Sequence, residues 1–256
     1  MHALKLVFAI LLAWLAAWQA AGMASAQPAS ARVAVAANFR APMAELASAY
    51  QARTGHTLSV SAGSTGQLFA QIANGAPFDV FLSADQARPE RLGELGLATA
   101  DSRFTYAEGQ LFLLLQDDGL LSPGNSSPTL GTAKRISLAN PKTAPYGAAA
   151  MQVLQHLDFP NGPPLIAEAQ SISGVNAAMT AGAVDAGFAA FSSVATLPPA
   201  QQPPGWLVPR TLHDPIRQDA ILLNRGADNP AATGFLDWLR TEDAREIIRR
   251  YGYHVD

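Results

Sequence analysis

The sequence RVAVAANFR occupies residues 32–40 and begins the first recognisable structural unit of the chain. Its first six residues, 32–37, are rich in Val and Ala and predict a short β-strand, and the last three predict a turn. Pro42 stands where the first turn of a helix tolerates proline, and apolar residues then recur with a helical period over 43–53 before Gly55. A strand followed by a helix is therefore expected here.

The same alternation continues along the chain, interrupted by loops at 117–132 and 198–218 that are rich in proline and other turn residues. We expect strands at 32–37, 58–61, 78–83, 136–139, 165–169, 186–191 and 220–223, and a β-rich stretch at 104–116. We expect helices at 43–53, 67–73, 88–94, 146–157, from 171–174 onward, and at 231–250. Repeated strand-helix units predict an α/β fold with mostly parallel sheets, and the two loops predict that the chain crosses twice between two lobes.

The composition excludes several classes of protein. Hydrophobic residues make up 49% of the 256 residues and charged residues only 14%, which excludes a disordered chain. The net charge of −3 argues against a nucleic-acid partner, because phosphate binding needs a surplus of basic residues. Cysteine is absent and no two of the five histidines share a helical turn, so we expect neither a bare metal ion nor a bound cofactor.

The first 26 residues predict a cleaved secretory signal. Lys5 precedes an apolar run over 6–17, and Ala24-Ser25-Ala26 forms a small-residue cleavage site. An uncleaved N-terminal anchor is the alternative, although the apolar run is short for a membrane span. The mature chain would begin near Gln27, and export without cysteine suits the periplasm, where we expect the protein to be located.

Candidate ligand-binding residues lie at the turns that follow the strands, because open α/β sheets bind ligands outside the carboxyl ends of their strands. Each turn leads into a helix whose first N–H groups are unpaired and carry a partial positive charge, so four such turns would surround a small anion. Ordinary helix capping by Asn and Ser, and packing of the tyrosine ring, are the alternatives. The candidates are Asn38, Ser64, Thr65, Tyr146, Ile172 and Ser173.

Catalytic motifs are weak in this sequence. The segment AGSTG at 62–66 lacks the first glycine of a G-x-S-x-G nucleophile elbow, and neither a P-loop nor a G-x-G-x-x-G motif occurs. Asp79, Asp85 and Asp219 are possible acids or bases, and Asp85 is also a candidate helix cap. We expect no enzyme; an exported hydrolase that uses Ser64 remains an alternative, as does a structural or adhesion domain with an empty cleft.

Five segments, in order along the chain, resemble the periplasmic molybdate-binding proteins of ABC importers, which have the type II periplasmic binding-protein fold. These segments are VAVAANF (33–39), SAGSTGQ (61–67), GAPFDVFLSADQ (75–86), NPKTAPYG (140–147) and DAGFAAF (185–191). The resemblance covers nearly the whole mature chain. It implies two lobes, each a mostly parallel sheet flanked by helices, with lobe 1 formed by 27–110 and 215–256 and lobe 2 by 111–214.

The resemblance also implies a binding site for a tetrahedral oxyanion in the cleft between the lobes, made of hydroxyl, amide and backbone N–H donors without a cation. The matching positions are Ala37, Asn38, Ser64, Tyr146 and Ile172, with Asn38 donating through its side-chain amide or backbone N–H. Phe191 departs from the pattern, since one branch of the family has a ligand-binding tyrosine there, and we expect Tyr146 to supply the phenol instead.

The function implied by this resemblance is capture of molybdate, or tungstate, and delivery to an ABC permease with its ATPase. The partners are thus a small oxyanion and the transporter, without nucleic acid, and the receptor is expected to be a monomer. A receptor for sulfate or another small oxyanion is the alternative within the same class. A preference between molybdate and tungstate does not follow from the sequence.

Overall fold

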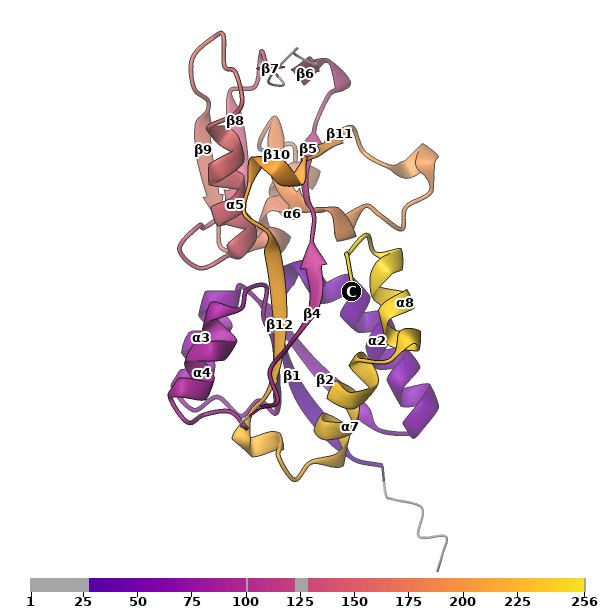
Figure 1. The fold of residues 1–256 in the computed structure, drawn as a ribbon. Coiled ribbons are helices and arrows are strands. Elements are labelled where there is room, and N and C mark those ends of the chain that lie inside the picture. Colours follow the sequence, from indigo (N-terminus) through magenta and orange to yellow (C-terminus); the bar gives the residue numbers. More distant parts are fainter. Residues whose placement is uncertain (1–27, 100, 123–128, 256) are drawn as a thin grey trace, which may run out of the picture.

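The computed structural model describes residues 28–99, 101–122 and 129–255, so the predicted signal at 1–26 lies outside the described residues. Two β-sheets lie one above the other in Figure 1, and each is flanked by helices. Strand β4 runs upward from the lower sheet toward the upper one and its antiparallel neighbour β12 runs back down, which places the two crossings of the chain side by side. None of the described helices combines the length and the apolar character that a membrane span requires.

The first sheet has the strand order β2-β1-β3-β12-β4. Its strands β1, β2 and β3 are parallel, whereas β12 is antiparallel to β3 and β4. The strands are β1 (Ser30–Ala36), β2 (Thr57–Gly63), β3 (Val80–Leu82), β4 (Phe104–Gly109) and β12 (Ile216–Leu222). The accompanying helices are α2 (Arg40–Thr54), α3 (Thr65–Ala73), α4 (Ala87–Glu94), α7 (Pro230–Leu239) and α8 (Glu242–Arg250).

The second sheet has the strand order β11-β5-β10-β8-β9, in which β8, β9 and β10 are parallel and β5 is antiparallel to both of its neighbours. Its strands are β5 (Leu111–Leu115), β8 (Arg135–Ala139), β9 (Leu165–Ala169), β10 (Ala186–Ala190) and β11 (Gly205–Leu207), and its helices are α5 (Pro145–Leu154) and α6 (Ile172–Thr180). Two-residue strands β6 (Leu121–Ser122) and β7 (Thr129–Leu130) form a separate ribbon. The predicted α/β fold with two sheets and flanking helices is confirmed.

Short 3₁₀ helices connect these elements. They are η1 (Ala37–Phe39), η2 (Asp118–Leu120), η3 (Phe191–Ser193), η4 (Pro199–Gln201), η5 (Arg210–Leu212) and η6 (Asn224–Gly226). Of these, η1 joins the end of β1 directly to α2 and contains Asn38.

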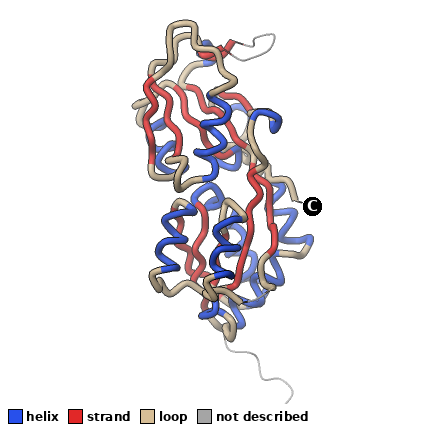
Figure 2. Tube along the Cα trace, turned by 60° about the vertical axis from the view of Figure 1, so that its left-hand side comes forward, coloured by secondary structure: helices blue, strands red, loops and turns tan. Residues whose placement is uncertain are grey.

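Apolar residues on both faces of a strand explain why both faces of a sheet are covered. In β1, Val33 and Val35 belong to a core with Phe39 and Phe235, whereas Ala34 belongs to a second cluster on the other face. Successive residues of a strand point to opposite faces, so a continuous apolar strand needs a cover on both sides. Figure 2 shows helices on both sides of the lower sheet and two strands that run together between the two parts of the molecule.

The β-rich stretch expected at 104–116 forms two strands, because the chain changes sheets at Gln110 between β4 and β5. Two other expectations about local structure are wrong. The expected helix 231–250 is α7 and α8, because Thr241 adopts an extended backbone (ψ 159°) and begins a new helix with Glu242 in its first turn. The expected loop 198–218 contains β11 and the start of β12.

Candidate functional site

Four turns, two from each sheet, meet at one small pocket. The first sheet contributes the turns after β1 and β2, and the second sheet contributes those after β8 and β9. The pocket volume is about 10 Å³, roughly the room that one water molecule needs. The lining residues are Ala36, Ala37, Asn38, Gly63, Ser64, Thr65, Ala84, Ala144, Pro145, Tyr146, Ser171 and Ile172.

All five residues that the family resemblance assigned to a ligand line this pocket, as does the further turn candidate Thr65, whereas the candidate Ser173 lies outside the lining. Their positions in the sequence are far apart, but each follows the carboxyl end of a strand, and the two sheets present these ends to each other. The five residues are Ala37, Asn38, Ser64, Tyr146 and Ile172. The structure therefore brings the predicted group together in one place, and their roles as ligand contacts stay a prediction.

The electrostatic character of the pocket comes from helix N-termini. Ser64 precedes α3, Tyr146 is the second residue of α5, and Ile172 begins α6, so the first N–H groups of these helices lack intrahelical acceptors. The first turns of α2, α3, α5 and α6 contain no acidic residue. None of the described residues that line the pocket is charged. The arrangement favours an anion through neutral donors and partial dipole charges.

Ser64 places at the pocket a buried hydroxyl that has no hydrogen-bond partner in the described part of the chain. The residue is only 3% exposed and occupies the N-cap position of α3, but its side chain makes no capping hydrogen bond. Its Oγ has no hydrogen-bond partner among the described residues. A buried hydroxyl without a partner costs about 1–3 kcal/mol, so helix capping does not explain this serine.

Asn38 is held by partners behind the pocket. Its Nδ2 donates to Oε1 of Gln218 at 2.9 Å and to the hydroxyl of Tyr253 at 3.1 Å, which engages both amide hydrogens. Its carbonyl accepts from Ser192 Oγ at 2.8 Å and from the Tyr253 hydroxyl at 2.9 Å. Of the two donors expected for Asn38, the side-chain amide is thus already used, and the backbone N–H in the first turn of η1 is the group left for a ligand.

Tyr146 lies with its hydroxyl against the strands that connect the two sheets. Its oxygen accepts from Gln218 Nε2 at 3.4 Å, and a Cβ added to Gly109 would lie 1.9 Å from it, so only glycine fits there. Burial raises the pKa of Tyr146 well above its usual value, and the nearby Tyr253 adds to this effect. The phenol therefore stays neutral and keeps its proton for donation.

A buried network around Gln218 was missed by sequence reasoning. Gln218 is fully buried, and its Oε1 also accepts from the Tyr106 hydroxyl at 3.0 Å, whose pKa is raised by burial. The bonds join residues 180 or 215 positions apart, such as Asn38 with Gln218 and with Tyr253. No local pattern marks these partners, because the contacts form between residues far apart in the sequence.

Phe191 lies outside the pocket lining. Its ring packs against Phe112 with centroids 5.7 Å apart, and it leaves no space for a side chain at Gly252. The next residue, Ser192, joins the network around Asn38. Phe191, which departs from the family pattern, therefore makes apolar contacts here, one of them beside Gly252 near the C-terminus. The expectation that Tyr146 supplies the phenol stays a prediction.

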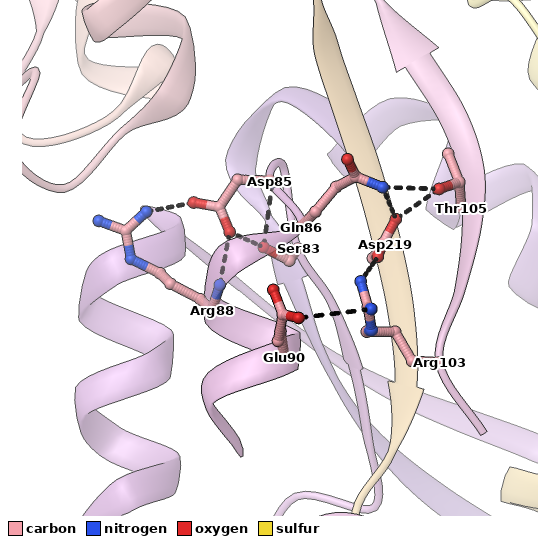
Figure 3. Close-up of polar contacts among 8 residues, drawn as sticks. All are labelled: Ser83, Asp85, Gln86, Arg88, Glu90, Arg103, Thr105 and Asp219. Carbon is pink, nitrogen blue, oxygen red and sulfur yellow. Dashed lines mark hydrogen bonds and ion pairs between the residues drawn. The ribbon is translucent and has the colours of Figure 1, made fainter. Parts of the chain in front are cut away.

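The three candidate carboxylates all have partners away from the pocket. Asp219 pairs with Arg103 at 2.8 Å and accepts from Thr105, and Asp85 pairs with Arg88, as Figure 3 shows. Asp79 accepts from the backbone N–H of Arg32. In the described part of the chain, no group of three or more His, Cys, Asp or Glu side chains could hold a metal ion.

A larger hollow of about 360 Å³ lies next to the pocket and shares Ala84 and Pro145 with it. It is lined by charged side chains such as Asp85, Arg88 and Arg217, and it lacks the turns after β1, β2 and β9. The smaller pocket is the better candidate for an anion, since the turns after β1, β2, β8 and β9, each of which begins a helix, converge on it.

Comparison with known proteins identifies close relatives. Residues 31–254 match the family described as bacterial extracellular solute-binding protein. The molybdate-binding protein ModA of Azotobacter vinelandii is 44% identical over 230 residues, which cover 90% of this chain and 91% of the relative. The ModA protein of Rhodobacter capsulatus is 42% identical over 222 residues, 86% of each chain.

A solved structure supports the same relationship. The periplasmic molybdate-binding protein of Azotobacter vinelandii superimposes with a TM-score of 0.76 and 33% identity, covering 88% of this chain and 99% of that protein. The similarity thus extends over both sheets and over all four turns of the pocket.

Proposed function

Because the chain belongs to the bacterial extracellular solute-binding protein family, we propose that its pocket captures a tetrahedral oxyanion, molybdate or tungstate, for an ABC importer. Relatives at 42–44% identity bear the name molybdate-binding protein and align over most of their length. The residues that line the pocket supply the donors that such an anion needs. The function is therefore binding and delivery of molybdate.

The unpartnered hydroxyl of Ser64 carries this proposal. It is buried in a pocket at which the N-termini of η1, α3, α5 and α6 converge. A dianion there accepts from Ser64 Oγ and from first-turn N–H groups, each charge-assisted bond contributing roughly 1.5–3 kcal/mol. Several such bonds suffice for submicromolar affinity after the costs of closing the site.

The chemistry of the pocket also predicts which anions it rejects. All of the expected contacts are donors, so a protonated anion such as hydrogen phosphate would leave its own O–H without an acceptor, at a cost of about 1–3 kcal/mol. Sulfate carries the right charge but has shorter bonds, and a rigid set of donors spaced for molybdate would contact only part of it. The present pocket volume of about 10 Å³ requires the walls to part before any of these anions enters.

We further propose how the chain is organised around the pocket. Lobe 1 comprises residues 27–110 and 215–256 and lobe 2 comprises 111–214, and the assignment of strands to the two sheets supports these bounds. The ligand cleft lies between the lobes. The receptor acts as a periplasmic monomer after cleavage near Ala26, and its partners are the permease and the ATPase of the importer.

Binding without catalysis is the function that the pocket supports. A serine hydrolase needs a general base within reach of its nucleophile. The described residues that line the pocket beside Ser64 include no His, Lys, Asp or Glu. We accordingly propose that the protein is not an enzyme and that it needs no cofactor besides its anionic ligand.

Thermal unfolding of residues 27–256 with molybdate, tungstate, sulfate or phosphate tests the function. A ligand at roughly 100 times its Kd stabilises the fold by about 2.7 kcal/mol, which raises the midpoint of unfolding by about 5–11 °C. We expect a shift with molybdate or tungstate only. A shift of equal size with sulfate would favour the alternative receptor, and no shift with any of the four anions would contradict oxyanion binding.

A further inference from the structure

A charged side chain bridges the two sheets beside the pocket. Arg88, in the first turn of α4, donates from Nη2 to the backbone carbonyl of Lys142 at 2.9 Å. Lys142 belongs to the turn between β8 and α5, so this bond joins lobe 1 to lobe 2. Arg88 does not line the small pocket, and its guanidinium is therefore not placed to contact the anion.

The guanidinium is held in position from behind by Asp85. The carboxylate of Asp85 forms an ion pair with Arg88 Nη1, and its Oδ1 accepts from the Arg88 backbone N–H at 3.1 Å. Ser83 Oγ donates to the same oxygen at 3.0 Å, as Figure 3 shows. The side chains of Arg88 and Asp85 are 26% and 20% exposed, so water screens this pair less than an ordinary surface pair.

A second bond between the lobes lies directly beside the first. The backbone N–H of Gly66 donates to the carbonyl of Thr143 at 2.8 Å. A Cβ added to Gly66 would lie 3.0 Å from Thr143 Cα and 3.2 Å from Arg88 Nη2, which shows how closely the three groups pack. Gly66 is two residues from Ser64, so these contacts form at the edge of the pocket.

We propose that Arg88 is a positioning residue that holds the two lobes together over the bound anion and thereby sets the rate of its release. The inference rests on the proposed function. Asp85 orients the guanidinium on lobe 1, and the carbonyl of Lys142 is its acceptor on lobe 2. When the lobes part, this bond breaks together with the bond between Gly66 and Thr143, and the anion is free to leave.

Arg91 provides a matched control on the same helix. It pairs with Glu94 at 2.7 Å, with both side chains more than half exposed, and it forms no hydrogen bond or ion pair with the described residues of lobe 2. Removing Arg91 therefore changes the charge of the chain as much as removing Arg88 does, but it leaves the contacts between the lobes intact. Arg88→Lys keeps the positive charge but removes the planar guanidinium. A single ammonium cannot contact Asp85 and the Lys142 carbonyl at the same time, as the guanidinium does.

The experiment measures release of radiolabelled molybdate after a chase with unlabelled molybdate, for the wild type, Arg88→Ala, Arg88→Lys and Arg91→Ala. We expect release from both Arg88 variants to be about three- to tenfold faster, as loss of a partly exposed charge-assisted bond predicts, and release from Arg91→Ala to be unchanged. Equal release rates in all four proteins would overturn the proposal. Thermal unfolding of each variant confirms that the fold is retained.

Amide hydrogen exchange at Gly66 gives a readout that does not depend on molybdate. Its N–H lies in the first turn of α3 and has the Thr143 carbonyl of lobe 2 as its acceptor, so its exchange reports separation of the lobes. We expect faster exchange in both Arg88 variants than in the wild type and Arg91→Ala, and unchanged exchange would overturn the proposal even if release were faster. If the wild type failed to bind molybdate, the proposed function would fail, and exchange at Gly66 would still decide whether Arg88 joins the lobes.

Discussion

Ser64 and Gln218 are buried polar side chains in the same region between the sheets, but only Gln218 has hydrogen-bond partners. Gln218 is fully buried and contacts Asn38, Tyr106 and Tyr146 through its amide. Ser64 is 3% exposed, and its Oγ has no partner among the described residues. A buried network whose members all have hydrogen-bond partners stabilises a fold, whereas a buried hydroxyl without a partner lowers its stability. The two residues therefore have different roles.

The difference indicates how stability and binding are divided at this site. The network around Gln218 joins β12, η1 and the C-terminal segment and fixes the position of the connecting strands. The pocket beside it keeps a donor that the chain itself does not satisfy. Substitutions in the network should therefore mainly change the free energy of unfolding, and substitutions in the pocket should mainly change the affinity for molybdate.

Gln218→Leu should produce the largest change. It removes the acceptor of one Asn38 amide hydrogen and the donor to the Tyr146 hydroxyl, both of them buried, so we expect the free energy of unfolding to fall by about 2–4 kcal/mol. Chemical denaturation measures this value. Gln152→Leu is the control, because its two side-chain hydrogen bonds with Asp214 are exposed to solvent and their loss should cost under about 1 kcal/mol. A similar small loss for both would contradict the structural role of the network.

Ser64→Ala should separate binding from stability. It removes a hydroxyl without a partner, so we expect molybdate affinity to fall about tenfold or more while the free energy of unfolding stays equal or rises. Ser192→Ala is the matched control: this buried serine donates to the carbonyl of Asn38, and its loss should cost about 1 kcal/mol of stability. Calorimetric titration and denaturation measure both quantities. Unchanged affinity in Ser64→Ala would remove this residue from the site.

Tyr146→Phe should affect both quantities, because Tyr146 belongs to the pocket and to the network. We expect molybdate to bind about tenfold more weakly, and the free energy of unfolding to fall by roughly 0.5–1.5 kcal/mol since Gln218 Nε2 loses its acceptor. Titration of the variant beside the wild type measures the first change. Full affinity together with reduced stability would place Tyr146 in the network alone.

The pH dependence of stability should show the smallest effect. Burial raises the pKa of Tyr146, so the folded state keeps the proton after the unfolded chain has lost it, and the stability present below about pH 10 is lost as the pH rises. Between about pH 9.5 and 10.5, the loss for one such tyrosine is roughly 0.7 kcal/mol. The decline in Tyr146→Phe should be smaller than in the wild type by about this amount, and parallel curves would argue against a buried phenol.

The sequence predicted the parts of the site that follow strands. The turns at Asn38, Ser64, Tyr146 and Ile172 were found because parallel strands end at one edge of a sheet and because each turn begins a helix, and the structure places all four at one pocket. Their roles toward a ligand came from the family resemblance rather than from spacing, and those roles stay predictions.

The rest of the site depends on distant contacts. Whether the Asn38 amide is free or engaged is decided by Gln218 and Tyr253, which lie 180 and 215 residues away. The change of sheet at Gln110 was missed because the apolar residues on either side continue the same strand pattern. The division between α7 and α8 had a local signal, Thr241 followed by Glu242 and Asp243, which is typical of a helix start.

The most direct test of the central claim is a crystal structure of the molybdate complex, in which anomalous scattering locates the molybdenum. We predict that the anion lies between the turns after β1, β2, β8 and β9, with a ligand oxygen within about 3.2 Å of Ser64 Oγ and no cationic side chain in contact with it. An anion bound elsewhere, or one in this pocket that leaves Ser64 Oγ without a contact, would contradict the account.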